Sequence, residues 1–519
     1  MISLDKQHDP KGNRDLIARF AGSIDMAEAV RETDDLFESR KTGSEPFHYK
    51  IGGFKGLLKR FLLIKKAELL DAGRGDTFVD KEGNPWPFWK GKLDGAMDSL
   101  LSQVSRVASV KDYGARGDGV TDDTEAFRRA IGNGRVRVRV PEGKYTVKGI
   151  KLPSWTILEG EGKGKTILKL HDRAPKSEWV ITNKHHYTGN RGILVQNLSL
   201  DWNVERIPPG RKTAAGNNRS SCLTYANVKY GWVKNVEAIN AGLHAFDVSS
   251  ALYTYLGDGT RARKGSSYIW LDGLNGYGFG DDGVTTHHSD NILISNCHMC
   301  DPSGRAHKRG FSNSNGFEVD DGSRNVWLVN NSSTRCFGGV EIKAHHNSAA
   351  ASNVYITGHI SIRDNRSFNF RHIGHHKLED PKSLTAYNIR AACLVAIAPV
   401  RTSLYEGSKA RGMVVSGYTN VAVNHFTLIG DPEYDYRGEP VLTVQYRARN
   451  ITLKNISMEG FKTAGHYLKV YGGPQRADSV SVINVKLDTD AEDAVYAGAD
   501  LEDILIGNIM KAGSGTSLG

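Results

Sequence analysis

A short pattern recurs through most of the 519-residue chain and limits the fold more than any other feature. An asparagine is followed by alternating apolar residues, and successive copies begin roughly 30 residues apart. Alternation predicts a strand with one buried face, and recurrence at coil length predicts a solenoid, in which each Asn amide can bond the coils above and below. The chain is therefore predicted to be all-β, a single-stranded parallel β-helix. The copies start at Asn291, Asn325, Asn353, Asn388, Asn420 and Asn450, with weaker ones at Ile193, Val480 and Ile504.

The segment 110–131 predicts how the β-helix begins. It reads as a strand, a glycine-rich turn and a helix whose first free amides Thr121 or Asp122 can cap. The helix is expected to bury Ala126, Phe127, Ala130 and Ile131. This segment resembles the opening of the pectate-lyase-like (pectin-lyase-like) superfamily, in which a strand and a short helix cap the first coil of a right-handed β-helix. We therefore expect residues 109–519 to form the β-helix.

Residues 1–108 differ from the rest and predict an α-helical attachment or neck region. One basic amphipathic helix is expected to pack on a partner subunit or virion site, with a membrane surface as the alternative. Its apolar positions are Phe54, Leu57, Leu58, Phe61 and Leu62. A second segment fits either a short coiled-coil seam or an ordinary amphipathic helix. Its apolar positions are Leu93, Met97, Leu100, Val104 and Val107.

Charge and cysteine content narrow the partners and the compartment. A formal net charge of +10 indicates a polyanionic partner: nucleic acid, an anionic membrane surface or an acidic glycopolymer. Five cysteines imply no disulfide framework, and Cys297 and Cys300 are expected to be buried thiols rather than metal ligands. The first twenty residues lack an apolar core of signal-peptide length, so we expect synthesis in the host cytoplasm without Sec export, and no transmembrane span.

Three consecutive coils place polar residues on one face of the strand that precedes each repeat. If Val284, Phe317 and Val340 point inward, the two-residue period sends their neighbours outward. We expect one exposed face, because a glycine precedes each strand and bares the floor of a groove. The outward residues are Thr285, His287, Glu318, Asp320, Glu341, Lys343 and His345, and Asp281 and Asp282 lead into the first strand.

Such density of titratable groups indicates an active site. Neighbouring carboxylates raise one another's pKa, so one can act as an acid and another as a base, and a histidine can move protons near neutral pH. The predicted catalytic residues are Asp282, His287, Glu318, Asp320 and Glu341. The predicted substrate-binding residues are Lys343, His345, Arg371, His372 and Arg447.

Two other interpretations of this face stay open. Paired histidines at 287–288, 345–346 and 375–376 allow a divalent metal, zinc or another, at the carboxylate and histidine cluster. Alternatively, Lys343 forms ordinary cross-strand salt bridges with Asp320 and Glu341 on a wet surface, where they add little stability.

Several motifs in the same order resemble the preneck appendage (tail spike) proteins of small podophages of Gram-positive bacteria. They are GDDGVTTHHS, GFEVDDGSRNV, GGVEIKAH, FRHIGHH and VQYRARN, within 110–460. The resemblance implies a homotrimeric spike, located on the virion and joined to neck or tail proteins through its N-terminal region. It also implies a depolymerase of wall teichoic acid that works during host adsorption, with no nucleic-acid or membrane partner. No autocleaving chaperone domain is recognised after the β-helix.

A second resemblance is more distant. GDDG and GGVEIKAH are similar to the GDD and RIK elements of polygalacturonases, but Glu341 replaces the arginine and no GHG element follows. Three functions therefore remain in view. The first is hydrolysis of a teichoic-acid phosphodiester, the second is a glycoside hydrolase or lyase acting on acidic capsular polysaccharide, and the third is a non-catalytic receptor-binding spike.

Overall fold

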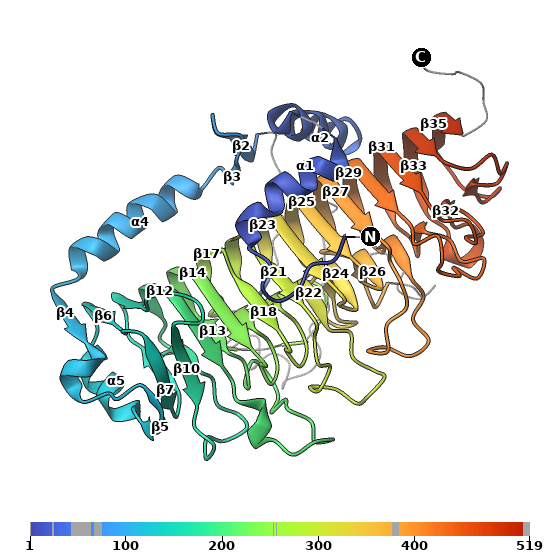
Figure 1. Cartoon of the computed structure of the whole chain (residues 1–519). Coiled ribbons are helices and arrows are strands. Elements are labelled where there is room, and N and C mark those ends of the chain that lie inside the picture. The colour runs from blue at the N-terminus through green and yellow to red at the C-terminus, as the bar shows by residue number, and fades with distance from the viewer. Residues whose placement is uncertain are drawn as a thin grey trace, which may run out of the picture.

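The computed structural model describes residues 2–22, 25–42, 64–66, 75–252, 254–255, 257–375 and 383–511. Parallel strands stack coil upon coil from β4 (Arg106–Ser109) at one end to β35 (Ile504–Lys511) at the other (Figure 1). The predicted right-handed parallel β-helix is confirmed. Each copy of the repeated pattern starts a strand that pairs in parallel with the equivalent strand of the next coil.

Each coil in the middle of the molecule has three faces. The long strand β23 (Arg324–Thr334) pairs with β25 (Ser352–Ile362) on both sides of Asn330, whose φ of 51° bends the strand. Asparagine tolerates this left-handed conformation better than most residues. The third face is formed by a short strand such as β24 (Gly338–Ala344), which belongs to a separate sheet.

Two large sheets account for most strands of the described residues. The nineteen-stranded sheet contains β4, β23, β25 and β35. Its other strands are β5 (Asp118–Asp122), β6 (Val136–Arg139), β7 (Gly143–Val147), β9 (Thr156–Glu159), β10 (Thr166–Leu170), β12 (Asn190–Asp201), β14 (Val228–Ile239), β17 (Ser267–Asp272), β18 (Asn275–Tyr277), β20 (Asp290–Ser295), β21 (His298–Cys300), β27 (Tyr387–Ile397), β29 (Thr419–Ile429), β31 (Arg449–Glu459) and β33 (Asp478–Leu487). The twelve-stranded sheet contains β24 and β8 (Ile150–Leu152), β11 (Ile181–Asn183), β13 (Leu223–Ala226), β15 (Phe246–Ser249), β19 (Val284–Thr286), β22 (Asn315–Val319), β26 (Arg366–His372), β28 (Arg411–Ser416), β30 (Leu442–Gln445), β32 (Leu468–Val470) and β34 (Val495–Ala497). Two antiparallel pairs lie apart: β1 (Ile64–Lys66) with β16 (Thr260–Ala262), and β2 (Thr77–Val79) with β3 (Pro85–Pro87).

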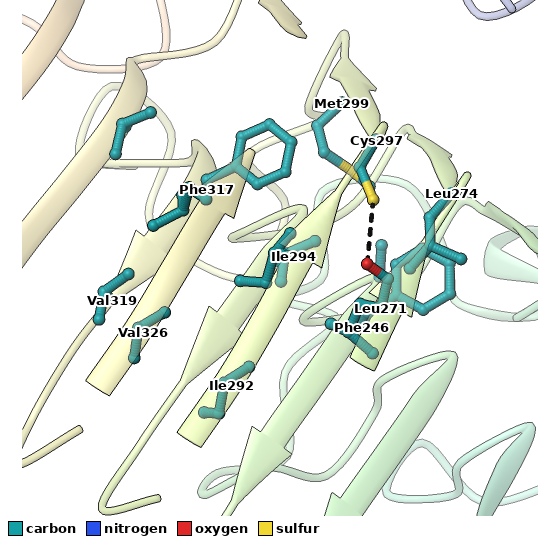
Figure 2. Close-up of a cluster of buried hydrophobic side chains, with 14 of the residues drawn as sticks. Phe246, Leu271, Leu274, Ile292, Ile294, Cys297, Met299, Phe317, Val319 and Val326 are labelled. Atoms are coloured by element: carbon teal, nitrogen blue, oxygen red, sulfur yellow. Dashed lines mark hydrogen bonds between the residues drawn. The ribbon is translucent and has the colours of Figure 1, made fainter. Parts of the chain in front are cut away.

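Apolar side chains from the three faces fill the interior of the β-helix. Phe246, Ile292 and Phe317 are fully buried, and Figure 2 shows them stacked with their neighbours from adjacent coils. The five cysteines are free and buried, and the Cys297 thiol donates to the backbone oxygen of Ser295 at 3.1 Å. Burial raises the pKa of this thiol, so it behaves as a small apolar side chain.

The expected asparagine stack is present. We call Asn291, Asn325, Asn353, Asn388, Asn420 and Asn450 the asparagine ladder. Each side-chain amide donates to the carbonyl of the preceding rung, over 3.1 Å from Asn325 to Asn291 and 2.8 Å from Asn388 to Asn353. The chain of bonds continues through the remaining rungs. Every rung has positive φ, so the same residue type serves both the turn and the bond.

The first coil is capped as predicted. Helix α5 (Thr124–Ile131) buries Ala126, Phe127, Ala130 and Ile131 against the end of the β-helix. Asp122 accepts from the Thr124 amide at 3.1 Å. The open end of the apolar interior is therefore closed by a short amphipathic helix.

The N-terminal helices lie along the outside of the β-helix (Figure 1). Helices α1 (Asn13–Ala21) and α2 (Met26–Arg40) cover part of the face formed by β25, β27 and β29, and α4 (Lys90–Gln103) packs on β12, β14 and β17. Ile17 of α1 packs in an apolar cluster with Ile360 and Val395. Short 3-10 turns lie at Pro10–Gly12, Val110–Tyr113, Val204–Arg206 and Gly473–Gln475.

The proposed coiled-coil seam packs within the chain. Leu93 and Leu100 are fully buried in a cluster with Trp232 and Trp327 of the β-helix, which favours an ordinary amphipathic helix over an oligomerising neck. Val107 is instead an exposed residue of β4. The amphipathic segment at 54–62 lies outside the described residues. None of the helices in the described part of the chain is long and apolar enough to cross a membrane.

Candidate active site

The three strands singled out from the sequence are neighbours in the twelve-stranded sheet. Thr285 of β19 pairs with Glu318 of β22, which pairs with Glu341 of β24. Val284, Phe317 and Val340 are fully buried in the apolar interior, so the predicted alternation is confirmed. The outward side chains therefore stack as expected. We call Asp282, His287, Glu318, Asp320, Glu341 and Lys343 the charged ladder.

The charged ladder is buried, so the expectation of an exposed face is wrong. The side chains of Lys343 and Glu318 are 4% and 3% exposed, whereas that of His345 is 44% exposed. The loop after β15 covers part of this face, which a two-residue period cannot reveal. The ring of Tyr255, in the loop after β15, lies 5.2 Å from the ring of His345. The ladder thus lies under a cover, with His345 at its edge.

Buried ion pairs neutralise the charges in the centre of the ladder. The Lys343 Nζ lies 2.5 Å from Glu318 Oε1 and 3.6 Å from Asp320 Oδ2, and Arg371 Nε lies 2.5 Å from Glu341 Oε1. The expected salt bridge between Lys343 and Asp320 forms, but it is buried and not on a wet surface, and Glu341 pairs with Arg371 instead of Lys343. Burial acts against both charged forms, yet these partners raise the pKa of Lys343 and lower that of Asp320.

His287 lies between two carboxylates. Its Nε2 is 3.4 Å from Asp320 Oδ2, and its Nδ1 is 3.8 Å from Asp247 Oδ1. Burial disfavours the imidazolium, but hydrogen bonds and charge from the two aspartates outweigh burial and raise the pKa of His287 to about 10. His287 is therefore a fixed cation at neutral pH rather than a group that titrates there.

One end of the ladder holds an aspartate pair whose environments differ. Asp281 Oδ1 lies 2.8 Å from His307 Nε2, and its Oδ2 lies 3.7 Å from His244 Nε2. Burial acts to raise the pKa of Asp281, but the two histidines lower it. Asp282 is the opposite case, because burial and the charges of Asp281 and Glu318 raise its pKa well above the usual value. Such a pair can supply a base and a protonated acid side by side.

Asn315 connects this end to the centre. Its side-chain amide donates to Asp282 Oδ1 at 3.0 Å and to Glu318 Oε1 at 3.1 Å, and its backbone amide also donates to Asp282. Thr285 donates to Glu318 at 3.1 Å. The carboxylates are therefore held in place by donors of defined geometry, which pre-organises them.

A basic cavity adjoins the Asp281 end. Its volume is about 570 Å³, and loops after β21 and before β13 and β28 form its walls. His307 lines it, and the same imidazole contacts Asp281. The other cationic residues of the wall are Arg211, Lys212, Arg305 and Arg309. Guanidinium groups suit bidentate binding of phosphate or carboxylate, so the cavity is suited to an anionic ligand.

The remaining predicted residues are more scattered. His345 is joined to Asp321 at 2.9 Å and lies 3.6 Å from Asp320, so it belongs to the edge of the ladder. His372 ends β26 and hydrogen-bonds Ser383 at 2.8 Å. Arg447 follows β30, three coils beyond β24, and the described contacts do not join its side chain to the ladder.

Sequence reasoning missed several members of the site. Phe246-Asp247-Val248 repeats, two coils earlier, the apolar–acidic–apolar pattern of 317–319, so Asp247 could have been found. His244 and His307 come from turns and long loops, where no periodicity exists to align them.

Carboxylate and histidine side chains of the site could also hold a metal ion. Three groups have ligand atoms within 4.8 Å of one another: His244 with Asp281 and Asp282, His287 with Glu318 and Asp320, and His345 with Asp320 and Asp321. In the second group Lys343 already supplies a cation to both carboxylates. That lysine makes the centre of the ladder the least suitable of the three for a metal.

Comparison with known proteins defines the class. A family model described as rhamnogalacturonase A/epimerase, pectate lyase-like, matches residues 107–341. The phage-related protein YobO of Bacillus subtilis (strain 168) is 49% identical over 85% of this chain and 54% of its own length. The pre-neck appendage protein of Bacillus phage phi29 is 42% identical over 82% of this chain and 49% of its own length.

A solved structure agrees with these matches. The crystal structure of the pre-mature bacteriophage phi29 gene product 12 gives a TM-score of 0.73 at 41% identity, over 78% of this chain and 52% of that chain. The present chain has the right-handed parallel β-helix fold of the pectate-lyase-like superfamily, and the family model matches residues 107–341. Within that superfamily it is a homologue of the preneck appendage proteins of Bacillus phages, and it spans about half the length of the relatives it matches.

Proposed function

We propose that the chain is the β-helix part of a phage appendage that binds and cleaves an anionic polymer of the host cell wall during adsorption, with wall teichoic acid as the substrate. One observation carries the proposal: a basic cavity opens beside an aspartate pair whose pKa values are displaced in opposite directions. A poly(alditol phosphate) presents one negative phosphate in each repeat, which matches the arginines of the cavity wall.

The proposed reaction is hydrolysis of a phosphodiester. Phosphate oxygens bind the cationic wall, and Asp281, held as the anion beside His307, accepts a proton from the attacking water. The water oxygen bonds to phosphorus while the bond from phosphorus to the alditol oxygen breaks. Asp282, held neutral, donates its proton to that leaving oxygen. The products are two shorter chains, one ending in a phosphate monoester and the other in a hydroxyl.

The rest of the charged ladder has a positioning role in this proposal. Glu318, Asp320 and Glu341 are already paired with the cations Lys343, His287 and Arg371, so we assign the proton transfers to the aspartate pair and not to them. The charges of Glu318 and Lys343 act on Asp282, and Asn315 holds its carboxyl group in place. His345 and Arg371 lie at the more open edge, where they can bind a neighbouring phosphate.

The assembly is also part of the proposal. The relatives are named as preneck appendage proteins, which supports a virion location. We infer that residues 1–108 connect the spike to neck or tail proteins, that residues 109–519 form the depolymerase, and that three copies associate.

A second candidate is a glycoside hydrolase or lyase on an acidic polysaccharide. It is favoured by the description of the matching family model, rhamnogalacturonase A/epimerase. The same cavity and aspartate pair can serve a uronate polymer, because a carboxylate binds arginine as phosphate does.

The test is digestion of purified wall teichoic acid by the full chain, followed by phosphorus NMR and mass spectrometry. We expect phosphate monoester ends to appear and short alditol phosphates to be released. Asp282→Asn cannot donate the proton and should lower kcat by at least roughly 10²-fold. Asp301→Asn is the matched control, because Asp301 pairs only with a surface arginine, Arg335, among its charged contacts in the described structure, and should leave kcat unchanged.

The other outcomes decide between the candidates. Unsaturated or reducing sugar ends from an acidic polysaccharide, with teichoic acid intact, would assign the second candidate. Tight binding of cells with every polymer left at full length would assign a non-catalytic spike. Equal kcat for Asp282→Asn and wild type would remove the proposed acid.

A further inference from the structure

A loop after β15 crosses from the cover of the charged ladder to the turn after β26. Tyr255 of this loop contacts His345, and β16 of the same loop pairs with β1. Arg261 Nη2 anchors the loop to Asp290 Oδ1 at 2.9 Å. Between Tyr255 and Arg261, Asp258 lies beside two histidines, one at the end of β26 and one in the turn that follows it.

Asp258, His372 and His375 form a compact buried cluster outside the charged ladder. His375 Nε2 lies 3.1 Å from Asp258 Oδ2, and His372 Nδ1 lies 3.9 Å from Asp258 Oδ1. One ligand atom from each of the three lies within 4.8 Å of the other two. The two imidazoles are in contact, with ring centroids 4.2 Å apart, and their side chains are almost completely buried.

These distances suit a transition-metal ion. Bonds of about 2.0–2.1 Å to nitrogen and oxygen in a tetrahedron place neighbouring ligand atoms about 3.3 Å apart. The separation of His375 from Asp258 is already close to that value. Two histidines and one carboxylate are also a donor set that zinc and related divalent ions prefer over calcium or magnesium.

A second shell of donors holds the carboxylate in place. Leu384 donates its backbone amide to Asp258 Oδ2 at 2.5 Å, Ser383 donates its hydroxyl to the same oxygen at 3.2 Å, and Thr385 donates to Oδ1. Ser383 also hydrogen-bonds His372 Nδ1 at 2.8 Å, so Nε2 is the nitrogen of this ring that would bind the ion. Ordered ligands of this kind are typical of metal sites, because outer hydrogen bonds fix the orientation of the inner ones.

We propose that Asp258, His372 and His375 bind one divalent metal ion of the zinc class, which ties the loop after β15 to the turn after β26. The ion replaces the proton between His375 and Asp258. Because the same loop carries Tyr255 over His345, metal binding holds the cover of the charged ladder in place. The site does not depend on the activity proposed above, since none of its three ligands belongs to the aspartate pair or to the basic cavity.

The experiment measures zinc binding to the full chain after chelator treatment. Elemental analysis and calorimetry should give one tightly bound zinc ion per chain. Asp258→Asn and His375→Gln should each weaken binding by at least 10²-fold, with unchanged circular dichroism. His466→Gln is the matched control, since His466 also lies beside an aspartate, Asp493, at 3.8 Å, but on an exposed coil, and should bind zinc as wild type does.

A double variant tests where on the protein the ion binds. Glu318→Gln and Asp320→Asn together should keep zinc affinity within twofold if the ion lies at Asp258. Loss of zinc from that pair with retention by Asp258→Asn would overturn the proposal by moving the ion to the ladder. Absence of stoichiometric binding to the wild type would overturn it as well, leaving the cluster as a hydrogen-bonded network. If His375→Gln does not fold, Asp258→Asn, which keeps the shape of the side chain, still decides.

Discussion

Two ladders of polar side chains run along the same β-helix, and they are built in opposite ways. The asparagine ladder repeats one uncharged residue over six coils, and every rung makes the same bond to the one before. The charged ladder changes residue at each coil, and its central rungs are buried ion pairs. A rung that is repeated in every coil serves a structural requirement of every coil, here the turn and the bond to the coil before. A rung that differs from coil to coil serves no such common requirement.

Energetics lead to the same distinction. A buried amide whose bonds are satisfied stabilises the stack modestly, while a buried ion pair gains little over apolar residues of the same size. Nothing in the β-helix requires charge at the position of Glu341, because the next two coils of the sheet have Asn369 and Val414 at that position. The charged ladder therefore represents a local departure from what stability favours, as is typical of a functional site.

The largest expected effect comes from removing the central cation. Lys343→Met leaves Glu318 and Asp320 buried without their partner, so the free energy of unfolding should fall by about 3–5 kcal/mol. Urea unfolding followed by circular dichroism measures the change. Lys486→Met, on an exposed position of β33, is the control and should change stability little. Combining Lys343→Met with Glu318→Gln and Asp320→Asn should recover part of the stability, which would assign the loss to unpaired charge. Equal stability of Lys343→Met and Lys486→Met would contradict the prediction.

The asparagine ladder and the apolar interior could be predicted from the sequence because both follow fixed periods. A two-residue period placed Val284, Phe317 and Val340 inside, and the coil-length repeat aligned Thr285 with Glu318 and Glu341. Periodicity contains no information about what covers a face. The burial of Lys343, the contact of His307 with Asp281 and the contact between Tyr255 and His345 depend on loops of irregular length, so they needed the structure.

The next effect concerns pH. The folded protein raises the pKa of His287 from 6.5 to about 10, so the protonated form is favoured by folding. Its stabilisation is complete below about pH 6.5 and is lost as the pH rises through 10, by roughly 3 kcal/mol between pH 7 and 9.5. The Tm difference between wild type and His287→Gln should therefore shrink over this range. Val414→Ala on β28 of the same sheet removes no ionisable group and should show a constant difference.

The smallest effect tests the other ladder. Asn388 donates to Asn353 at 2.8 Å, accepts from Asn420 at 3.1 Å and has a φ of 68°. Asn388→Ala loses both bonds and places a β-carbon in a left-handed conformation, so the free energy of unfolding should fall by about 2 kcal/mol with polymer cleavage unchanged. Asn388→Gly also loses both bonds but adopts the left-handed conformation without strain. The stability of Asn388→Gly should therefore lie between those of Asn388→Ala and the wild type.

The position of a rung in its row should set the size of this loss. Asn508 ends a second row, donating to Asn484 at 2.6 Å from an exposed position. With water available to replace its one bond, Asn508→Gly should cost less than about 0.5 kcal/mol. If Asn388→Gly and Asn508→Gly cost the same, the bonds between rungs add nothing beyond the turn conformation. If Asn388→Ala stops cleavage without loss of stability, the division between a structural and a functional ladder fails, because the asparagine row then acts on the site itself.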